Sequence, residues 1–231
     1  AVKGVTLNKQ KLQEIRCSIP PLPEQKKIAE ILSGIDRTIT QTSQRIEKHK
    51  TLLWAAVEQI FDALGGKAYF APLGDCCRHI LDFRGRTPAK LGMEWGGGTI
   101  RALSANNVRD GFIDFNRECC LGSESLYRNW MTRGDCIRGD IIFTMEAPMG
   151  NVAIIPDDEK YILSQRVVLL SPDRQQILPE YLYWFMRSSR FKSDCENLAT
   201  GTTAKGIKQT NLITISVPIA TLEEQEKAVQ L

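Results

Sequence analysis

Two short segments of this sequence carry residues that could do enzyme chemistry, and both lack the partners that such chemistry needs. Gly96-Gly97-Gly98 is a glycine run of the kind that holds a methyltransferase cofactor, but that loop follows a strand and this run precedes one. Asp158-Glu159-Lys160 has the acid-x-Lys order of a metal-dependent nuclease, yet it continues a turn begun by Pro156, and no second acid lies at a suitable spacing. The sequence contains no Walker loop and no Gly-x-Ser-x-Gly. We therefore expect no catalytic residues.

The seven cysteines and two histidines do not form a metal-binding pattern. The cysteines are odd in number, include two adjacent pairs, and show no C-x-x-C spacing. With only His49 and His79 to assist, we expect reduced thiols, no bound metal and a cytoplasmic location. No apolar run approaches the roughly 20 residues that span a bilayer, and the opening residues lack a signal-peptide pattern, so we expect no membrane contact.

Binding chemistry is better represented, in loops that combine cations with small polar residues. The net charge is only +3, from 30 basic and 27 acidic residues, so a nucleic-acid ligand would have to be held by local patches. In the first loop, residues 84–90, Arg84, Arg86 and Lys90 surround the hydroxyl of Thr87. Arginine can donate two hydrogen bonds to the O6 and N7 of guanine, and a glycine-containing loop can approach phosphates closely. The alternative interpretation is a solvated turn.

The second and third loops are less specific. Asn106, Asn107 and Arg109 follow a strand-like run; asparagine can pair with adenine N6 and N7, but adjacent asparagines also commonly form a turn. The third loop, residues 199–209, suits either phosphate contacts or a flexible linker. Its candidates are Thr202, Thr203, Lys205 and Lys208. In a fourth loop, residues 143–151, a strand ends in a loop that contains two methionines. Packing of these methionines in the core is the favoured interpretation.

A long periodic segment, residues 23–64, must help to position these loops. Apolar side chains recur at a 3-4 spacing for about five heptads, which predicts a helix with a narrow coiled-coil stripe. Pro23 suits the first turn and Gly65-Gly66 the stop, and the helix would be about 60 Å long at 1.5 Å per residue. The stripe consists of Ile28, Leu32, Ile35, Ile39, Thr42, Ile46, His49, Leu53, Val57 and Ile60. We expect this stripe to need a partner helix; the alternative is a helix lying along its own domain.

Residues 67–216 have a different pattern, in which short β-branched and aromatic runs alternate with Gly, Asn, Asp and Pro. Strands are expected at residues 78–83, 99–103, 112–115, 140–145, 152–155 and 166–170. Helices are expected at residues 124–132 and 179–192. The sequence therefore predicts an α+β fold, with one globular domain of mixed strands and helices joined to a long spacer helix.

The two ends of the sequence repeat one another with a period of 200 residues. Leu12, Ile15, Ile19, Leu22, Glu24, Gln25 and Lys27 recur as Leu212, Ile215, Ile219, Leu222, Glu224, Gln225 and Lys227. Seven identities in sixteen positions without a gap are hard to reach by chance, and Thr221 with Glu224 supplies a capping box for a second helix. We expect residues 1–22 to be the tail end of a preceding repeat unit and residues 217–231 to begin a second spacer helix.

These features together resemble a known family. The run at residues 19–32, IPPLPEQKKIAEIL, is similar to the start of the spacer helix in specificity (S) subunits of Type I restriction-modification systems. The strand at residues 139–144, the loop at residues 201–207 and the closing echo at residues 218–225 resemble the same family. The resemblance covers essentially the whole chain, and the internal repeat supports it independently.

The resemblance implies a non-catalytic subunit that recognises double-stranded DNA. In such subunits, each target-recognition domain reads one half of a split site, and long helices form an antiparallel coiled coil that sets the gap. The helices also dock methyltransferase (M) subunits, which hold S-adenosylmethionine. A restriction (R) subunit adds ATP- and Mg-dependent translocation and cleavage. The resemblance thus implies no cofactor in this chain itself.

This sequence departs from the full-length pattern, because it carries one recognition domain and one complete helix. It is either a fragment of a longer subunit or a half-length form that pairs with itself. For the isolated chain we expect an antiparallel homodimer, with the polar side chains of Thr42 and His49 setting the register. Two other classes stay open: a coiled-coil scaffold or decoy that binds the M subunit without reading DNA, and a self-contained DNA-modifying enzyme.

Overall fold

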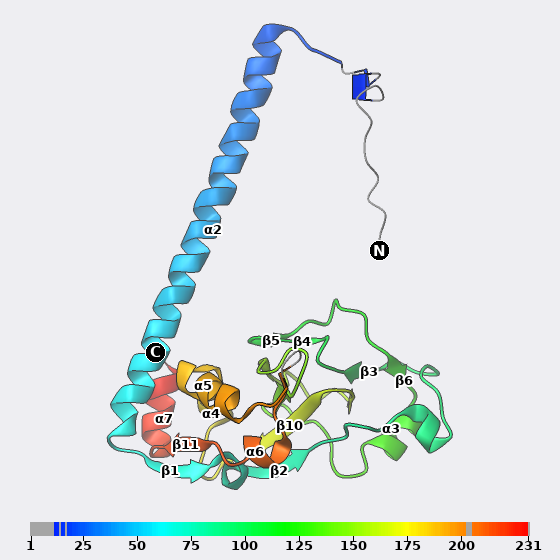
Figure 1. Ribbon diagram of the computed structural model, residues 1–231, viewed down its shortest axis with the longest axis vertical. Helices are drawn as coiled ribbons and strands as arrows, with labels where there is room; N and C mark the ends of the chain where they lie inside the picture. Colours follow the sequence, from blue (N-terminus) through cyan, green and yellow to red (C-terminus); the bar gives the residue numbers. More distant parts are fainter. Residues whose placement is uncertain (1–11, 14, 17, 202–204, 231) are drawn as a thin grey trace. The chain divides into compact units, whose positions relative to one another are not determined.

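The computed structural model describes residues 12–13, 15–16, 18–201 and 205–230, and the chain forms two compact units, residues 1–53 and 54–231. A single helix, α2 (Leu22–Gly65), begins in the first unit and ends in the second (Figure 1). Its 44 residues correspond to about 66 Å at 1.5 Å per residue, which confirms the long helix expected from the periodicity. Within the described residues, no helix combines the length and apolarity needed to cross a membrane.

The apolar stripe of α2 is exposed along the first unit and covered at its end. Its apolar members from Ile28 to Leu53 are 43–58% exposed. In the second unit, Val57 is only 5% exposed and Ile60 is half-buried, because these last turns pack where Phe61 contacts the core. The expected seam therefore divides into a free part, residues 28–53, and an end that the chain itself covers.

A four-stranded antiparallel sheet forms the centre of the second unit. Its order is β2 (Cys77–Leu81), β10 (Val167–Pro172), β7 (Ile141–Thr144) and β8 (Val152–Ile154). A three-stranded sheet has the order β6 (Leu121–Gly122), β3 (Ile100–Leu103) and β9 (Tyr161–Leu163), with β3 and β9 parallel. Two ribbons pair β1 (Tyr69–Pro72) with β11 (Ser216–Ile219) and β4 (Val108–Arg109) with β5 (Phe112–Ile113).

Short helices connect and cover these sheets. They are η1 (Leu73–Cys76), η2 (Pro88–Leu91), α3 (Glu124–Trp130), α4 (Pro179–Arg187), α5 (Ser189–Leu198), α6 (Gln209–Leu212) and α7 (Leu222–Val229). The single helix expected at residues 179–192 is wrong: Ser188 is extended and its hydroxyl accepts a hydrogen bond from the Phe191 N–H at 3.3 Å, which starts α5 afresh. The capping box of Thr221 and Glu224 at the start of α7 is confirmed.

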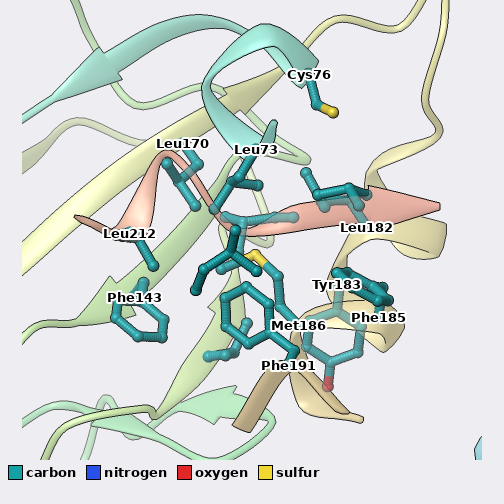
Figure 2. Close-up of a cluster of buried hydrophobic side chains, with 14 of the residues drawn as sticks. Leu73, Cys76, Phe143, Leu170, Leu182, Tyr183, Phe185, Met186, Phe191 and Leu212 are labelled. Carbon is teal, nitrogen blue, oxygen red and sulfur yellow. The ribbon is translucent and has the colours of Figure 1, made fainter. Parts of the chain in front are cut away.

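Alternation along the central strands sends apolar side chains to two cores, one on each face of the sheet. Phe143 and Leu170 enter the first core, where they meet Met186 of α4 and Phe191 of α5 (Figure 2). Ile142 and Leu169, their neighbours in sequence, enter the second core. Because both faces are covered, β7 and β10 are buried at every position. The α+β class expected from the sequence is confirmed.

Candidate nucleic-acid interface

A groove of about 570 Å³ lies at the end of β7, where Met145 and Glu146 leave the central sheet. We call it the β7 groove. Its lining includes Arg84 from the first predicted loop and Lys208 from the third. Met145 and Glu146 belong to the fourth loop, so the fold brings together three of the four predicted loops, although they are far apart in the sequence.

The third loop is closed at its base and pinned to the end of β7. Thr200 and Gly206 exchange backbone hydrogen bonds of 2.8 and 3.0 Å. The Ile207 N–H donates to the Met145 carbonyl at 3.0 Å, so the loop continues from the edge of the groove. Gly206 allows this close approach, because a Cβ there would lie 3.2 Å from the Met145 carbonyl oxygen.

The two lysines of the third loop reach the solvent. Lys205 and Lys208 are both exposed, and Lys208 is the residue that precedes α6. The other two candidates, Thr202 and Thr203, lie outside the described residues. Of the four candidates for phosphate contacts in this loop, the structure therefore describes only the two lysines.

Arg84 is held in a fixed orientation by Asp82. Its Nε and Nη2 both donate to the Asp82 Oδ2, at 2.9 and 2.5 Å. Burial raises the pKa of Asp82, but hydrogen bonds from Arg84 outweigh it, and the pKa lies below its usual value. Within the described part of the chain, the Nη1 of Arg84 makes no hydrogen bond. An arginine fixed along one edge can donate from the other with little further loss of side-chain freedom.

The other candidates of the first loop stabilise the loop itself. Arg86 donates to the carbonyl of the last residue of α3, and its guanidinium carbon lies 5.1 Å from the centre of the Phe83 ring. Thr87 caps η2 by accepting the Lys90 N–H at 3.4 Å, and the Lys90 Nζ donates to the Gly85 carbonyl at 2.6 Å. The loop is therefore more than a solvated turn, because internal hydrogen bonds hold its conformation without a ligand.

Two further arginines, Arg133 and Arg166, lie beside the groove residues Arg84 and Glu146 or their neighbours, although no local sequence pattern marks them. We call Arg84, Lys208, Arg133 and Arg166 the cationic border. The guanidinium carbon of Arg133 lies 4.5 Å from the centre of the Phe83 ring, and its Nη2 donates to the Asp82 carbonyl. Arg166 precedes β10, and its Nε lies 3.9 Å from the Glu146 Oε1. Each stands alone in a turn, so only the folded chain brings it beside the predicted loops.

The second predicted loop lies outside the β7 groove, and its two asparagine side chains form hydrogen bonds within the fold. Asn107 is 2% exposed, and its Oδ1 accepts hydrogen bonds from the N–H and hydroxyl of Ser104 at 3.3 and 3.2 Å. Asn106 is exposed, but its Nδ2 donates to the Glu118 carbonyl at 3.2 Å. Arg109 is half-buried in β4. The turn interpretation is the right one for Asn107, which a base edge could not reach.

The β4–β5 hairpin is fastened to α4 instead. The Arg187 Nε lies 2.9 Å from the Asp110 Oδ1, and the Tyr183 hydroxyl donates to the Gly111 carbonyl at 3.0 Å. The Arg187 guanidinium carbon also lies 4.8 Å from the centre of a Trp54 ring. Gly111 has a φ of 106°, a backbone conformation that favours glycine. A Cβ there would lie 2.9 Å from the Arg187 Nη2, so a larger residue would also displace that guanidinium.

The buried thiols of Cys76 and Cys195 are unreactive. Burial raises the pKa of Cys76 and of Cys195 to about 12, so neither forms the thiolate that nucleophilic or metal-binding chemistry needs near neutral pH. Among the described residues, no group of three His, Cys, Asp or Glu side chains is arranged to hold a metal ion.

Comparison with known proteins first defines the fold. The crystal structure of the HsdS subunit from Thermoanaerobacter tengcongensis is similar, with a TM-score of 0.56 at 17% sequence identity. The alignment covers 92% of this chain and 50% of that one. The mixed α/β unit with its long helix is therefore an HsdS-like fold.

The family follows from the sequence match. Residues 2–49 and 72–231 match the Type I restriction modification DNA specificity domain, and the chain belongs to this family. The resemblance drawn from its motifs is thus confirmed. In an enzyme of this type, the specificity subunit is the non-catalytic part.

Curated relatives cover nearly all of this chain. The Type I restriction enzyme MjaVIII specificity subunit of Methanocaldococcus jannaschii is 26% identical over 240 residues, which are 95% of this chain and 55% of the relative. The Type I restriction enzyme EcoBI specificity subunit of Escherichia coli is 23% identical over 250 residues, covering 97% and 52%. The chain spans about half the length of the curated relatives it matches.

Proposed function

We propose that this chain reads part of a DNA target sequence for a Type I restriction-modification complex. The observation that carries the proposal is the β7 groove, where Arg84, oriented by Asp82, lies with Lys208. Such a groove can combine a base contact, which specifies sequence, with phosphate contacts, which set position. A net charge of +3 is sufficient, because the cations are gathered where the ligand would bind.

The chain would read one half of a split site, with α2 setting the distance to a second reading unit. The support is the exposed stripe of residues 28–53, whose apolar side chains would gain from contact with another helix. In the isolated chain, the proposed partner is a second copy in antiparallel orientation, with Thr42 and His49 setting the register. Two identical reading units would favour a palindromic split target.

The helix is also proposed to dock the M subunit, and the complex to include an R subunit. In this proposal, M supplies S-adenosylmethionine and R supplies the ATP- and Mg-dependent steps. The support is family membership, together with the length of α2, whose free stripe offers room for more than one helical partner.

The repeat supports a proposal for the organisation of the whole chain. The Gln225 Nε2 donates to the Ala220 carbonyl at 2.8 Å, and the Gln25 Nε2 donates to the Pro20 carbonyl over the same span of five residues, also at 2.8 Å. The two copies differ in burial, since Leu212 is fully buried and Leu12 is 55% exposed.

We therefore propose that residues 1–22 are the tail end of a preceding repeat unit, of the kind that residues 212–225 complete in this chain. Residues 23–64 would then be the spacer helix, residues 67–216 the target-recognition domain, and residues 217–231 the start of a second spacer helix.

The test is selection of bound duplexes from a random-sequence pool by the purified chain, at about 150 mM salt so that non-specific phosphate binding is weakened. Enrichment of a partly defined sequence is the expected result. A chain that enriches nothing but still binds the M subunit would be a scaffold or decoy. Methyl transfer to DNA by the isolated chain with S-adenosylmethionine would instead indicate a self-contained enzyme.

A further inference from the structure

Glu146 is an acid in a groove whose other charged lining residues, Arg84 and Lys208, are cations. Its Oε1 lies 3.9 Å from the Arg166 Nε, at the outer limit of an ion pair, and both side chains are about half exposed, at 52% and 49%. Within the described residues, the Glu146 carboxylate makes no hydrogen bond of its own. The carboxylate is therefore close to cations and still available to a ligand.

The backbone around Glu146 is tightly held. The Met145 N–H donates to the Arg166 carbonyl at 2.8 Å, and the Met145 carbonyl accepts the Ile207 N–H at 3.0 Å. Ala147 and Arg166 have φ angles of 47° and 65°, a left-handed conformation that residues other than glycine rarely adopt. Such strained residues persist where their surroundings impose them, and they concentrate at functional sites.

A carboxylate in this position would oppose phosphate binding. Its charge reaches Arg84, whose pKa is raised first by the hydrogen bond to Asp82 and further by Glu146. A groove that bound only phosphates would be better without an acid, because like charges repel. What the carboxylate adds is a hydrogen-bond acceptor among donors.

The bases differ in what they offer to such a pair of groups. In the major groove, guanine presents the acceptors N7 and O6, and its partner cytosine presents the N4 amino donor. An arginine and a glutamate side by side match the two halves of that G·C edge. Adenine, which presents a donor and an acceptor together, is matched by an amide side chain instead.

We propose that Glu146 determines specificity by accepting a hydrogen bond from the N4 amino group of a cytosine in the target, while Arg84 donates to guanine. The inference rests on the proposed function of the β7 groove and names one base pair that the groove selects.

The test uses the sequence enriched by the wild-type chain and a set of duplexes in which each C·G pair is changed to T·A. In the wild-type chain, one such change weakens binding about 5- to 150-fold. Glu146→Ala reduces that effect and leaves only the part that Arg84 supplies by donating to the guanine of the same pair. Its affinity for random duplex rises because a repelling charge is gone. Glu146→Gln moves the preference at that position towards adenine. The control is Glu159→Ala, which removes an exposed acid from a turn outside the groove and leaves every preference unchanged.

Two results would overturn the inference alone. Glu146→Ala could keep full discrimination at every cytosine, or it could lose affinity for enriched and random duplexes in equal proportion, which would indicate a structural ion pair with Arg166. A wild-type chain that enriches no sequence would overturn the proposed function together with this inference.

Discussion

Replacing Gln225 by alanine should destabilise the second unit, whereas the same replacement of Gln25 should not. Gln225 is fully buried, and its side-chain amide makes three hydrogen bonds to the backbone. It accepts the Leu178 N–H at 2.8 Å and donates to the carbonyls of Gln176 and Ala220 at 2.9 and 2.8 Å. The bonds join the start of α7 to the residues that lead into α4.

The magnitude follows from these three bonds. Each contributes about 1 kcal/mol net, and buried backbone groups left without partners cost somewhat more, so we expect a loss of about 3–4 kcal/mol. For a chain of this size, that corresponds to a fall in Tm of about 6–16 °C. Gln25 is half-buried and makes one side-chain bond in the described structure, which water can replace, so its replacement should change stability by less than about 0.5 kcal/mol.

Urea denaturation followed by tryptophan fluorescence measures the difference directly. All four tryptophans lie in residues 54–231, so the signal reports the unfolding of the second unit. Comparable m-values would show that the two variants differ in stability and not in the surface exposed on unfolding. Equal losses in both variants, or a Gln225→Ala change within about 0.5 kcal/mol of zero, would refute the assigned role of Gln225.

Three further predictions concern the seam, an ion pair and a glycine. Ile35→Asp with Ile39→Asp should shift the solution mass from twice 26.0 kDa to 26.0 kDa, because charges in an apolar seam are not tolerated, while Gln41→Asp with Gln44→Asp should leave the dimer intact. A single-chain mass for the wild type would contradict the proposed homodimer. The pKa of Asp82 is lowered in the folded chain, so its ion pair with Arg84 should stabilise the fold above about pH 4 and lose that effect on further acidification. The Tm difference between the wild type and Asp82→Asn should therefore shrink below about pH 4. A difference that grows there would contradict the assignment. Gly111→Ala should destabilise the second unit by about 1–3 kcal/mol in urea, and Gly85→Ala, with a φ of 80° but open space for a Cβ, should cost less; the reverse order would argue against the contact with Arg187.

Local patterns predicted the elements that local chemistry determines. The heptad spacing predicted α2 within one residue at each end, and Thr221 with Glu224 marked the start of α7. The apolar runs of β7 and β10 were recognisable because strands covered on both faces carry few polar residues. The break at Ser188 was missed, because the apolar spacing continues through it while the serine caps a new helix.

Features that depend on contacts between residues far apart in the sequence could not be predicted from local patterns. The pairing of β1 with β11 joins the two ends of the second unit, and neither strand shows a distinctive pattern by itself. Arg133 and Arg166 belong to the cationic border only because the fold brings their turns to Asp82 and Glu146. Asn107 shows the opposite case, because its side chain is of a type that could bind a base but instead forms hydrogen bonds within its own turn.

The central claim is that the β7 groove distinguishes one DNA sequence from another. The most direct measurement is the ratio of affinities for an enriched duplex and a scrambled duplex, in the wild type and in the double variant Arg84→Ala with Lys208→Ala. The control is Arg78→Ala with Arg138→Ala, two exposed arginines that line a different cavity, beside the start of α4. We predict that the groove variant lowers the ratio about tenfold or more and that the control leaves it unchanged. An unchanged ratio in the groove variant, or an equal fall in the control, would contradict the claim.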